Sequence, residues 1–309
     1  MRDALIGYTG FVGGNLVQQH AFSEVFNSKN IHTIEGQEFD LVVCAGVKAQ
    51  KWYANAHPQE DLDDITMLME HLKKASIKRF VLISTIDVYP QVINVDETTT
   101  MDLNQEQAYG RNRLKLEEWV KETYPLHHIV RLPGLFGFGL KKNFIYDYLH
   151  PIPGLINENL FKTMTGHLSN NESSVLTQFY NSTDKGYVWN QKGEDVLLPI
   201  LKKHHFTSLM FTDSRDQLQY YPLNYLWKHI SMIIEHSINL INMATEPVLI
   251  SDLHYALSQQ DFINHLSRPQ QNYNMKTIHD HVLGGHNGYL FSAHEVMGMC
   301  KQFVKDYTQ

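Results

Sequence analysis

The first half of the chain alternates short apolar runs with longer amphipathic segments. The apolar runs are nearly continuous, which is typical of strands buried on both faces of a parallel sheet. They lie at residues 4–10, where the run leads into a turn, and at 30–34, 39–46, 79–85 and 127–134. Helical spacing of apolar residues follows at 11–22, 58–76 and 107–124. This order predicts βαβ units and an α/β fold with a doubly wound parallel sheet of the Rossmann type.

The pattern changes beyond residue 150. A polar stretch at 166–195, rich in Asn, Ser, Thr and Gly, is interpreted as an insertion or loop region. Helical spacing returns at 221–237 and 292–307, with a possible strand at 238–244. We therefore expect a Rossmann domain over residues 1–150 and a smaller C-terminal lobe over 151–309, some segments of which return to the Rossmann domain.

Composition excludes several classes of protein. The 309 residues are 43% hydrophobic, and 26 Lys and Arg against 33 Asp and Glu give a formal charge of −7. No basic field exists to hold nucleic acid or an anionic membrane. The absence of a signal segment and of any long apolar run predicts a cytoplasmic protein. Cys44 and Cys300 are interpreted as buried thiols in a reducing compartment.

The 18 histidines are interpreted as surface or packing residues, and no metal site is expected. No cysteine accompanies them and no HExxH motif occurs, which are the patterns that zinc sites favour. The pairs lie in unrelated contexts at His127 and His128, His204 and His205, and His279 and His281.

A glycine-rich turn follows the first predicted strand. Gly7, Gly10 and Gly13 have the spacing G-x-x-G-x-x-G. Such glycines allow a tight turn, close approach of the backbone to a pyrophosphate, and close packing of helix on strand, while the helix N-terminus offers free N–H groups. Dinucleotide binding is predicted here, with Thr9, Phe11 and Val12 as further contacts.

The second predicted strand decides the form of the dinucleotide. If residues 30–34 are that strand, its end offers only Glu35 to an adenine ribose. Ser28 and Lys29 in the loop before it could bind a 2′-phosphate, which favours NADP over NAD. A solvated lysine in a turn is the alternative.

Three segments in order, residues 7–13, 81–90 and 109–117, followed by 131–144, resemble the extended short-chain dehydrogenase/reductases. This family is also called the NAD-dependent epimerase/dehydratase family and acts mostly on nucleotide sugars. The resemblance is clear to about residue 150 and weaker beyond. It implies a substrate-binding C-terminal lobe and a homodimer formed through the helices that follow the fourth strand and bear the tyrosine.

The resemblance also implies catalytic residues. Tyr109 corresponds to the family's acid/base tyrosine, and Thr85 to its catalytic hydroxyl. Arg113 stands where the family has a lysine, one helical turn after the tyrosine. Arginine keeps the charge that lowers a phenol pKa and can bind a ribose, but its planar fork does not fit an ammonium's place unchanged.

Further contacts follow from the family's fold. The cofactor is expected to touch Ala45, Gly46, Ser84, Arg113, Pro133 and Leu135. The substrate is expected to meet Asp87, Tyr89, Lys48, Trp52 and Asn143. Asp87 corresponds to an acid of the sugar dehydratases, but Ile86 replaces their second acid. Reduction, oxidation or epimerisation is therefore favoured over dehydration, and a cofactor-binding protein with weak or no catalysis, a sensor or interaction subunit, is the alternative.

Overall fold

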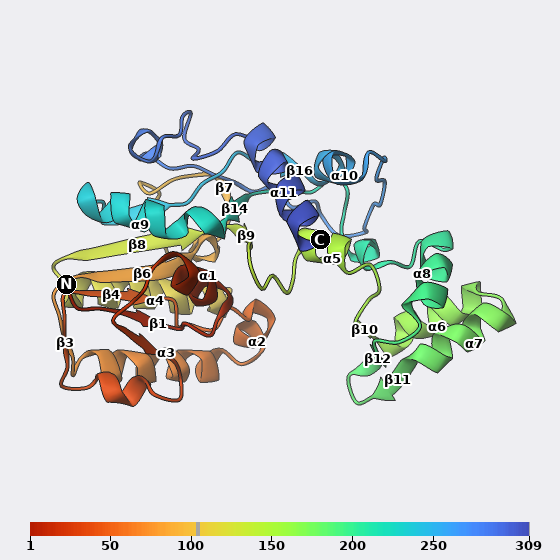
Figure 1. Ribbon diagram of the computed structural model, residues 1–309, viewed down its shortest axis with the longest axis horizontal. Helices are drawn as coiled ribbons and strands as arrows, with labels where there is room; N and C mark the ends of the chain where they lie inside the picture. Colours follow the sequence, from red (N-terminus) through yellow and green to blue (C-terminus); the bar gives the residue numbers. More distant parts are fainter. Residues whose placement is uncertain (103–105, 309) are drawn as a thin grey trace.

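The computed structural model describes residues 1–102 and 106–308 and centres on a six-stranded parallel sheet (Figure 1). The strands lie in the spatial order β15-β8-β6-β4-β1-β2. Their bounds are β1 (Asp3–Ile6), β2 (Glu24–Phe26), β4 (Leu41–Cys44), β6 (Phe80–Thr85), β8 (His127–Leu132) and β15 (Leu240–Asn242). The chain moves outward from β1 to β2 and then crosses back to β4, so the order reverses between β1 and β4. Ligands of doubly wound sheets bind at such a switch point, outside the carboxyl ends of the strands.

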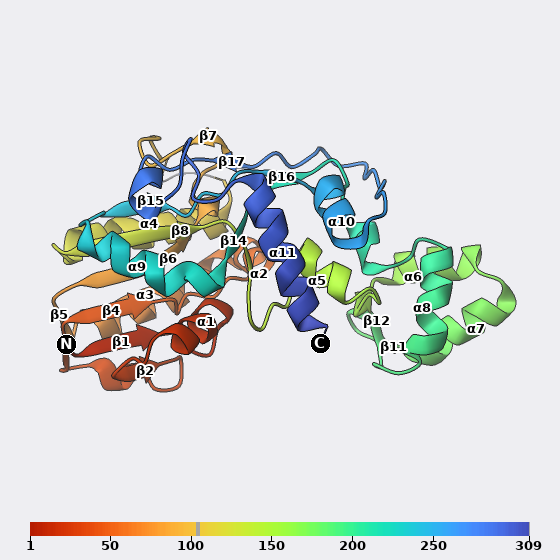
Figure 2. The same ribbon diagram turned by 45° about the horizontal axis from the view of Figure 1, so that its top comes forward.

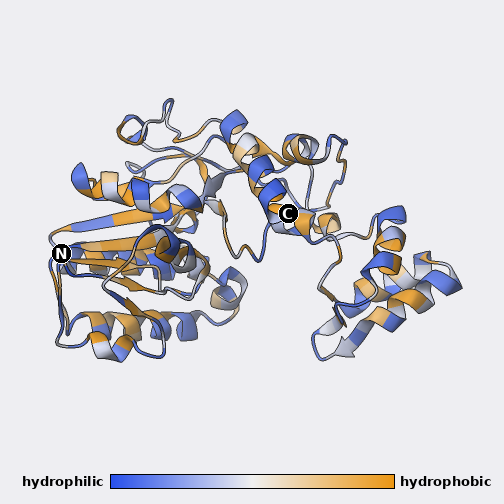
Figure 3. Cartoon of the chain, viewed as in Figure 1, coloured by the Kyte–Doolittle hydropathy of each residue, from blue (hydrophilic) through white to orange (hydrophobic). Residues whose placement is uncertain are grey.

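Helices cover both faces of the sheet. The helices α1 (Phe11–Gln19) and α9 (Leu226–Glu235) cover one face, and α3 (Pro58–Leu72) and α4 (Ala108–Thr123) cover the other (Figure 2). Side chains alternate between the two cores: Leu5 and Val43 pack with α1 and α9, whereas Val42 packs with α3 and α4. Strand β4 is apolar and buried along its whole length, and orange predominates in the inner strands of the sheet (Figure 3). The doubly wound α/β fold is confirmed.

One predicted strand is wrong. Residues 31–34 form a 3-10 helix, η1 (Ile31–Ile34), and the second strand is β2 at Glu24–Phe26. Ile31 and Ile34 are both buried while His32 and Thr33 are exposed. A 3-10 helix has three residues per turn, so two apolar residues three positions apart lie on the same side of it. In a run as short as this one, such a pattern is easily mistaken for that of a strand.

The C-terminal lobe is built from several segments, the first of which begins at Gly134, before the predicted boundary at 150, and it has its own core. Its members pack around Phe136, Tyr220, Leu253 and Cys300. Both cysteines are buried and free, as expected. Elements outside the six-stranded sheet from Gly134 onward include β9 (Gly134–Phe136), α5 (Phe144–Leu149), β13 (Gln217–Leu218), β14 (Tyr220–Pro222), β16 (Val248–Leu249), α10 (Ile250–Ser258), β17 (Asn274–Met275) and α11 (Ala293–Tyr307). Short elements of the first half are β3 (Glu38–Phe39), α2 (Lys51–Ala56), β5 (Ser76–Ile77), η2 (Ile86–Val88) and β7 (Ile93–Val95).

Of the two interpretations of the polar stretch, an insertion or a loop, the structure contradicts the loop, because the stretch forms regular elements. It belongs to a small lobe that stands apart from the rest of the chain in both ribbon views (Figures 1 and 2). The lobe contains β10 (Leu155–Ile156), α6 (Glu158–His167), α7 (Asn170–Phe179), β11 (Tyr180–Thr183), β12 (Gly186–Trp189) and α8 (Glu194–Lys203). Phe161, Met164, Leu176 and Leu197 form its core. Some of the polar residues in this stretch cap helices and are therefore not a sign of a loop. Ser169 forms a capping box with Glu172 at the start of α7.

Two buried arginine–carboxylate pairs hold α4 in place. On one side, Arg131 of β8 donates from Nε and Nη2 to Glu117 of α4, at 3.0 and 2.5 Å, and neither side chain is more than 2% exposed. On the other side, Arg113 of α4 forms a bidentate pair with Asp61 of α3; the Nη2–Oδ1 distance is 2.8 Å. Asp61 also accepts from Asn112, at 2.9 Å. Unpaired charges are costly to bury, so each pair fixes the position of α4.

Helix α9 carries a buried histidine. His229 is 2% exposed and lies within 2.8 Å of the Tyr221 hydroxyl through Nδ1. Burial lowers the pKa of His229 to about 4, from an ordinary value of 6.5. The folded chain therefore keeps this imidazole neutral over a range in which the unfolded chain takes up a proton.

We expect the free energy of unfolding to decrease as the pH falls from about 6.5 to 4. The unfolded state binds the additional proton there, so acidification favours unfolding. Over about 2.5 pH units at about 1.4 kcal/mol each, His229 contributes a decrease of about 3 kcal/mol. Urea unfolding at several pH values should show a flatter profile for His229→Gln. His236→Gln, an exposed histidine directly after the same helix, is the control and should keep the wild-type slope.

We expect Arg113→Met to lower the free energy of unfolding by about 3 kcal/mol or more, because the buried Asp61 carboxylate loses its partner. Replacing both residues, as Asp61→Leu with Arg113→Met, should recover part of the loss. The matched control is Lys48→Met, which breaks the exposed pair of Lys48 with Asp64 (2.7 Å) and should cost less than about 1 kcal/mol. Equal urea midpoints for Arg113→Met and Lys48→Met would contradict the structural role.

Candidate functional site

The glycine turn between β1 and α1 is shaped by close backbone contacts. Gly7 has φ +88°, and a Cβ there would lie 2.4 Å from the carbonyl oxygen of Ala45. A Cβ on Gly13 would lie 2.1 Å from the carbonyl oxygen of Gly7, so α1 packs against the turn only because this residue is glycine. Gly10 precedes α1 directly, where the first N–H groups of a helix have no intrahelical partner. The N-terminus of α1 can therefore receive an anion.

The other residues expected at the cofactor follow the carboxyl ends of neighbouring strands. Thr9 is exposed, and Phe11 and Val12 are half-buried at the start of α1. Ala45 and Gly46 follow β4 directly, while Pro133 and Leu135 follow β8 and enter β9. Because all these strands are parallel, their carboxyl ends meet at one edge of the sheet.

Ser28 and Lys29 lie directly beyond the end of β2. Both are exposed, and Lys29 forms no ion pair with the described residues. Glu35, the acid that the sequence offered to an adenine ribose, lies elsewhere: its carboxylate pairs with His71 (2.7 Å) and Lys74 (3.1 Å). Glu35 was considered only on the condition that residues 30–34 form the second strand, and that condition fails because the second strand ends at Phe26, eight residues before 34.

Tyr109, Thr85 and Asp87 come together where β6 ends. Thr85 is the last residue of β6, and its hydroxyl donates to Asp87 Oδ2 at 3.2 Å, while Thr85 and Asp87 both act on the nearby Tyr109 phenol. Tyr109 is near the N-terminus of α4, and its backbone N–H donates to Asn55 Oδ1 of α2 at 2.9 Å. The structure thus unites residues separated by 24 positions in the sequence.

Lys51 completes this group, although sequence reasoning missed it. It is the first residue of α2, and its Nζ lies 2.5 Å from Asp87 Oδ1. Burial works against the charged form of Lys51, but the adjacent Asp87 carboxylate raises the pKa of the amine above its usual range. Tyr273, which precedes β17, also faces Lys51 and Asp87 and was missed as well.

The environment of Tyr109 balances opposing effects on its phenol. Burial raises the pKa of Tyr109 above its ordinary value; Arg113 opposes this, and the negative charge of Asp87 raises the pKa further. The Thr85 hydrogen bond and the charge of Lys51 act in the lowering direction. The phenol is therefore protonated at neutral pH, as a proton donor must be.

Arg113 lies below the ring of Tyr109 rather than beside its oxygen. The guanidinium carbon is 4.0 Å from the ring centroid. Both terminal nitrogens bind Asp61, and they also donate to backbone oxygens, Nη1 to Tyr109 (3.3 Å) and Nη2 to Lys48 (2.5 Å). The side chain is 5% exposed. Arg113 therefore joins α4 to α3 from a buried position, and we call this role a clamp.

Several residues expected at the substrate or cofactor have other contacts. Tyr89 is 3% exposed, and its hydroxyl accepts from Arg131 (2.8 Å), so it belongs to the interior rather than to the cleft. Ser84 donates to Glu117 at 2.5 Å, which directs its hydroxyl away from the sheet edge. Lys48 pairs with Asp64, and Trp52 is 72% exposed.

Asn143 is committed to the start of α5. Its Oδ1 accepts from the N–H groups of Ile145 and Tyr146, and its Nδ2 donates to the carbonyl of Leu135 at 2.8 Å. Its φ of +109° is rare for a residue other than glycine. Helix capping accounts for this side chain.

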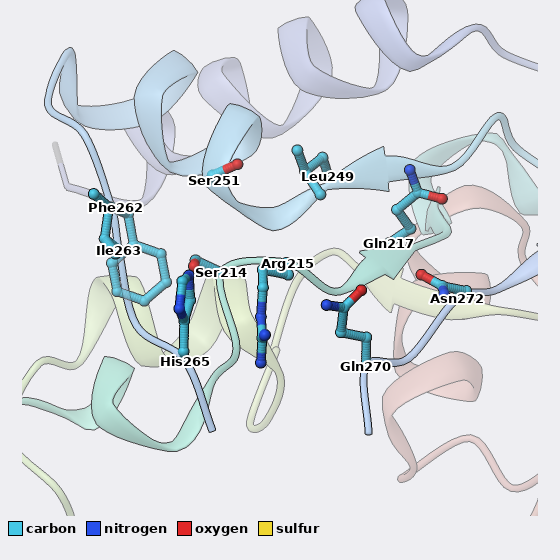
Figure 4. A pocket seen from close by; sticks show the side chains of 10 residues that line it. All are labelled: Ser214, Arg215, Gln217, Leu249, Ser251, Phe262, Ile263, His265, Gln270 and Asn272. Carbon is cyan, nitrogen blue, oxygen red and sulfur yellow. The ribbon is translucent and has the colours of Figure 1, made fainter. Parts of the chain in front are cut away.

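A cavity of about 580 Å³ lies in the C-terminal lobe (Figure 4). Its polar lining includes Arg215, Gln217, His265, Gln270 and Asn272. The carboxylate of Asp213 holds the Arg215 guanidinium at 2.7 Å, and burial leaves Asp213 with no exposed surface. Asn272 of the lining directly precedes Tyr273 in the chain.

Within residues 1–102 and 106–308, no three His, Cys, Asp or Glu side chains are grouped so as to hold a metal ion. In the same residues, no helix combines the length and apolarity needed to cross a membrane.

Comparison by sequence finds neither a matching family model nor a matching curated protein. Solved structures match over the whole chain. The UDP-N-acetylglucosamine 4-epimerase of Methanobrevibacter ruminantium M1, in complex with UDP-N-acetylmuramic acid, is 12% identical with a TM-score of 0.63, covering 99% of this chain and 98% of its own. The dTDP-4-dehydrorhamnose reductase of Bacillus anthracis, in complex with NADP, is 11% identical with a TM-score of 0.62, over 99% and 98%.

A third solved structure, the UDP-glucose 4-epimerase of Thermotoga maritima with UDP-glucose, is 11% identical with a TM-score of 0.61 and covers 100% of both chains. Identities this low establish a common fold. The chain therefore has the Rossmann-type fold with a C-terminal lobe that these three enzymes share, as the resemblance to the extended short-chain dehydrogenase/reductases implied.

Proposed function

We propose that the chain is a nicotinamide-dependent oxidoreductase or epimerase that acts on a nucleotide sugar or a related carbonyl or alcohol compound. The observation that carries the proposal is that Tyr109 and Thr85 come together at the same edge of the sheet as the glycine turn. The three structural neighbours, which act on or bind nucleotide sugars or bind NADP, support it.

A bound nicotinamide would supply or accept the hydride at a substrate carbon. In the reducing direction, Tyr109 gives its phenol proton to the substrate oxygen, and in the oxidising direction it takes the proton back. The Thr85 hydroxyl orients the same oxygen. Asp87 lies within reach of Thr85, at 3.2 Å, and offers a second acid or base.

The cofactor is proposed to be NADP, held as follows. Its pyrophosphate lies at the N-terminus of α1, close to Gly7, Gly10 and Gly13. Its 2′-phosphate lies at Ser28 and Lys29, where no carboxylate of the described residues is paired with the lysine. NAD is the alternative, in which Lys29 stays solvated.

The substrate is proposed to bind between Tyr109 and the cavity of the C-terminal lobe. The cavity presents amide side chains and one guanidinium, which suit the hydroxyl and phosphate groups of a nucleotide sugar. A homodimer through α3 and α4 stays a prediction.

A cofactor-binding protein with little or no catalysis is the second candidate. The commitment of Arg113 to Asp61 favours it, because the charge one turn after Tyr109 is already neutralised by an ion pair. The two candidates differ in turnover and not in cofactor binding.

We expect turnover of at least one nucleotide sugar, followed as a change of nicotinamide absorbance for an oxidoreductase or as formation of the epimeric sugar nucleotide for an epimerase, and a loss of roughly 10²- to 10⁴-fold in Tyr109→Phe, which lacks the proton. Tyr53→Phe is the matched control, since the Tyr53 hydroxyl binds Glu60 outside the site. NADPH binding without turnover in the wild type, across a panel of sugar nucleotides, would favour the second candidate.

Lys29→Ala is expected to weaken NADPH binding roughly tenfold, about 1.4 kcal/mol, and to leave NADH binding unchanged. The measurement is a fluorescence titration of each cofactor. Lys74→Ala, an exposed lysine paired with Glu35, is the control and should change neither affinity. An equal loss for both cofactors would show that Lys29 does not read the 2′-phosphate.

A further inference from the structure

Two cations among the described residues, Arg113 and Lys51, act on Tyr109. They differ in how far their N–H groups are already engaged by other residues. Both terminal nitrogens of Arg113 are engaged by Asp61 and by backbone oxygens, and the guanidinium faces the ring rather than the hydroxyl. The planar guanidinium is held in one orientation by its paired N–H donors. Its position leaves the oxygen end of the phenol without a donor from α4.

Lys51 approaches the same site from α2. Its ammonium has three N–H groups, and Asp87 accepts one of them at 2.5 Å. The side chain is 42% exposed, so the remaining N–H groups are accessible to a ligand. The bond from the Tyr109 N–H to Asn55 ties α2 to the start of α4, so Lys51 and Tyr109 keep a fixed relation.

We propose that Lys51, carried by α2, provides the ammonium group of the reaction centre, while Arg113 serves as a clamp between α3 and α4. This inference rests on the proposed function, because it assigns a task within the proton exchange of Tyr109. Lys51 is a positioning residue: it offsets the charge of Asp87 next to the phenol and thereby favours the ionised form of Tyr109.

The electrostatic effect has a definite sign. The charged groups that act on the phenol are Arg113 from α4, Asp87 from η2 and Lys51 from α2, and Tyr273 from the segment before β17 interacts in turn with Lys51 and Asp87. If Lys51 loses its charge, the Asp87 carboxylate acts on the phenol without its counter-ion. The neutral phenol is then favoured, and ionisation moves to higher pH.

The test needs no substrate or cofactor. Tyrosine is replaced throughout the full chain by 3,5-difluorotyrosine, whose phenol ionises at lower pH, and the signal of residue 109 is assigned by its absence in Tyr109→Phe. A pH titration followed by ¹⁹F NMR should give a higher midpoint in Lys51→Met than in wild type. Lys51→Arg, which keeps the charge, should restore the midpoint, and Lys48→Met should leave it unchanged.

Equal midpoints in Lys51→Met and wild type would overturn the inference. It would also be overturned if Arg113→Lys moved the midpoint and Lys51→Met did not. With a sugar nucleotide that is turned over, Lys51→Met should lower kcat by roughly 10²-fold and shift the kcat–pH profile to higher pH, while Lys51→Arg recovers most of the rate. Absence of turnover in wild type would contradict the proposed function alone, since the NMR titration still decides the role of Lys51.

Discussion

The position of α4 depends on charges that have been removed from water. Glu117 has no exposed surface and is compensated by Arg131, while Arg113 and Asp61 compensate each other one helical turn earlier. A buried ion pair adds little net stability, but a displaced partner would leave a charge unsatisfied, so the pairs tolerate only one register of the helix. Everything at the sheet edge that involves Tyr109 is set by this register.

The same network explains why some polar groups are absent from the cleft. Ser84 binds Glu117, and Tyr89 binds Arg131, so the hydroxyl groups next to the strand end stabilise the buried pair instead of facing a ligand. Thr85, the last residue of β6, is not bound to this pair; its hydroxyl donates to Asp87 and accepts from the Asp87 N–H instead.

The sequence predicted the features that follow from local pattern and not those that follow from helix placement. The glycine turn needs glycine for reasons of backbone contact, and Gly7 and Gly13 could be read from spacing alone. Lys51 could not, because its role depends on α2, a six-residue helix without helical periodicity long enough to detect. Arg113 was placed correctly beside Tyr109, yet its partner Asp61 lies 52 residues away in sequence on another helix, and no pattern along the chain links the two.

The inserted lobe meets the rest of the chain at one narrow place. The Ser208 N–H donates to the carbonyl of Pro151 at 2.8 Å, and the Ser208 hydroxyl donates to the carbonyl of His150, so the lobe's entry and exit lie side by side. With its own core and adjacent ends, the lobe is a module: a different unit can be joined at the same two points while the sheet and α4 keep their geometry. New contacts can thus arise in this chain without any change to the arrangement of side chains around Tyr109.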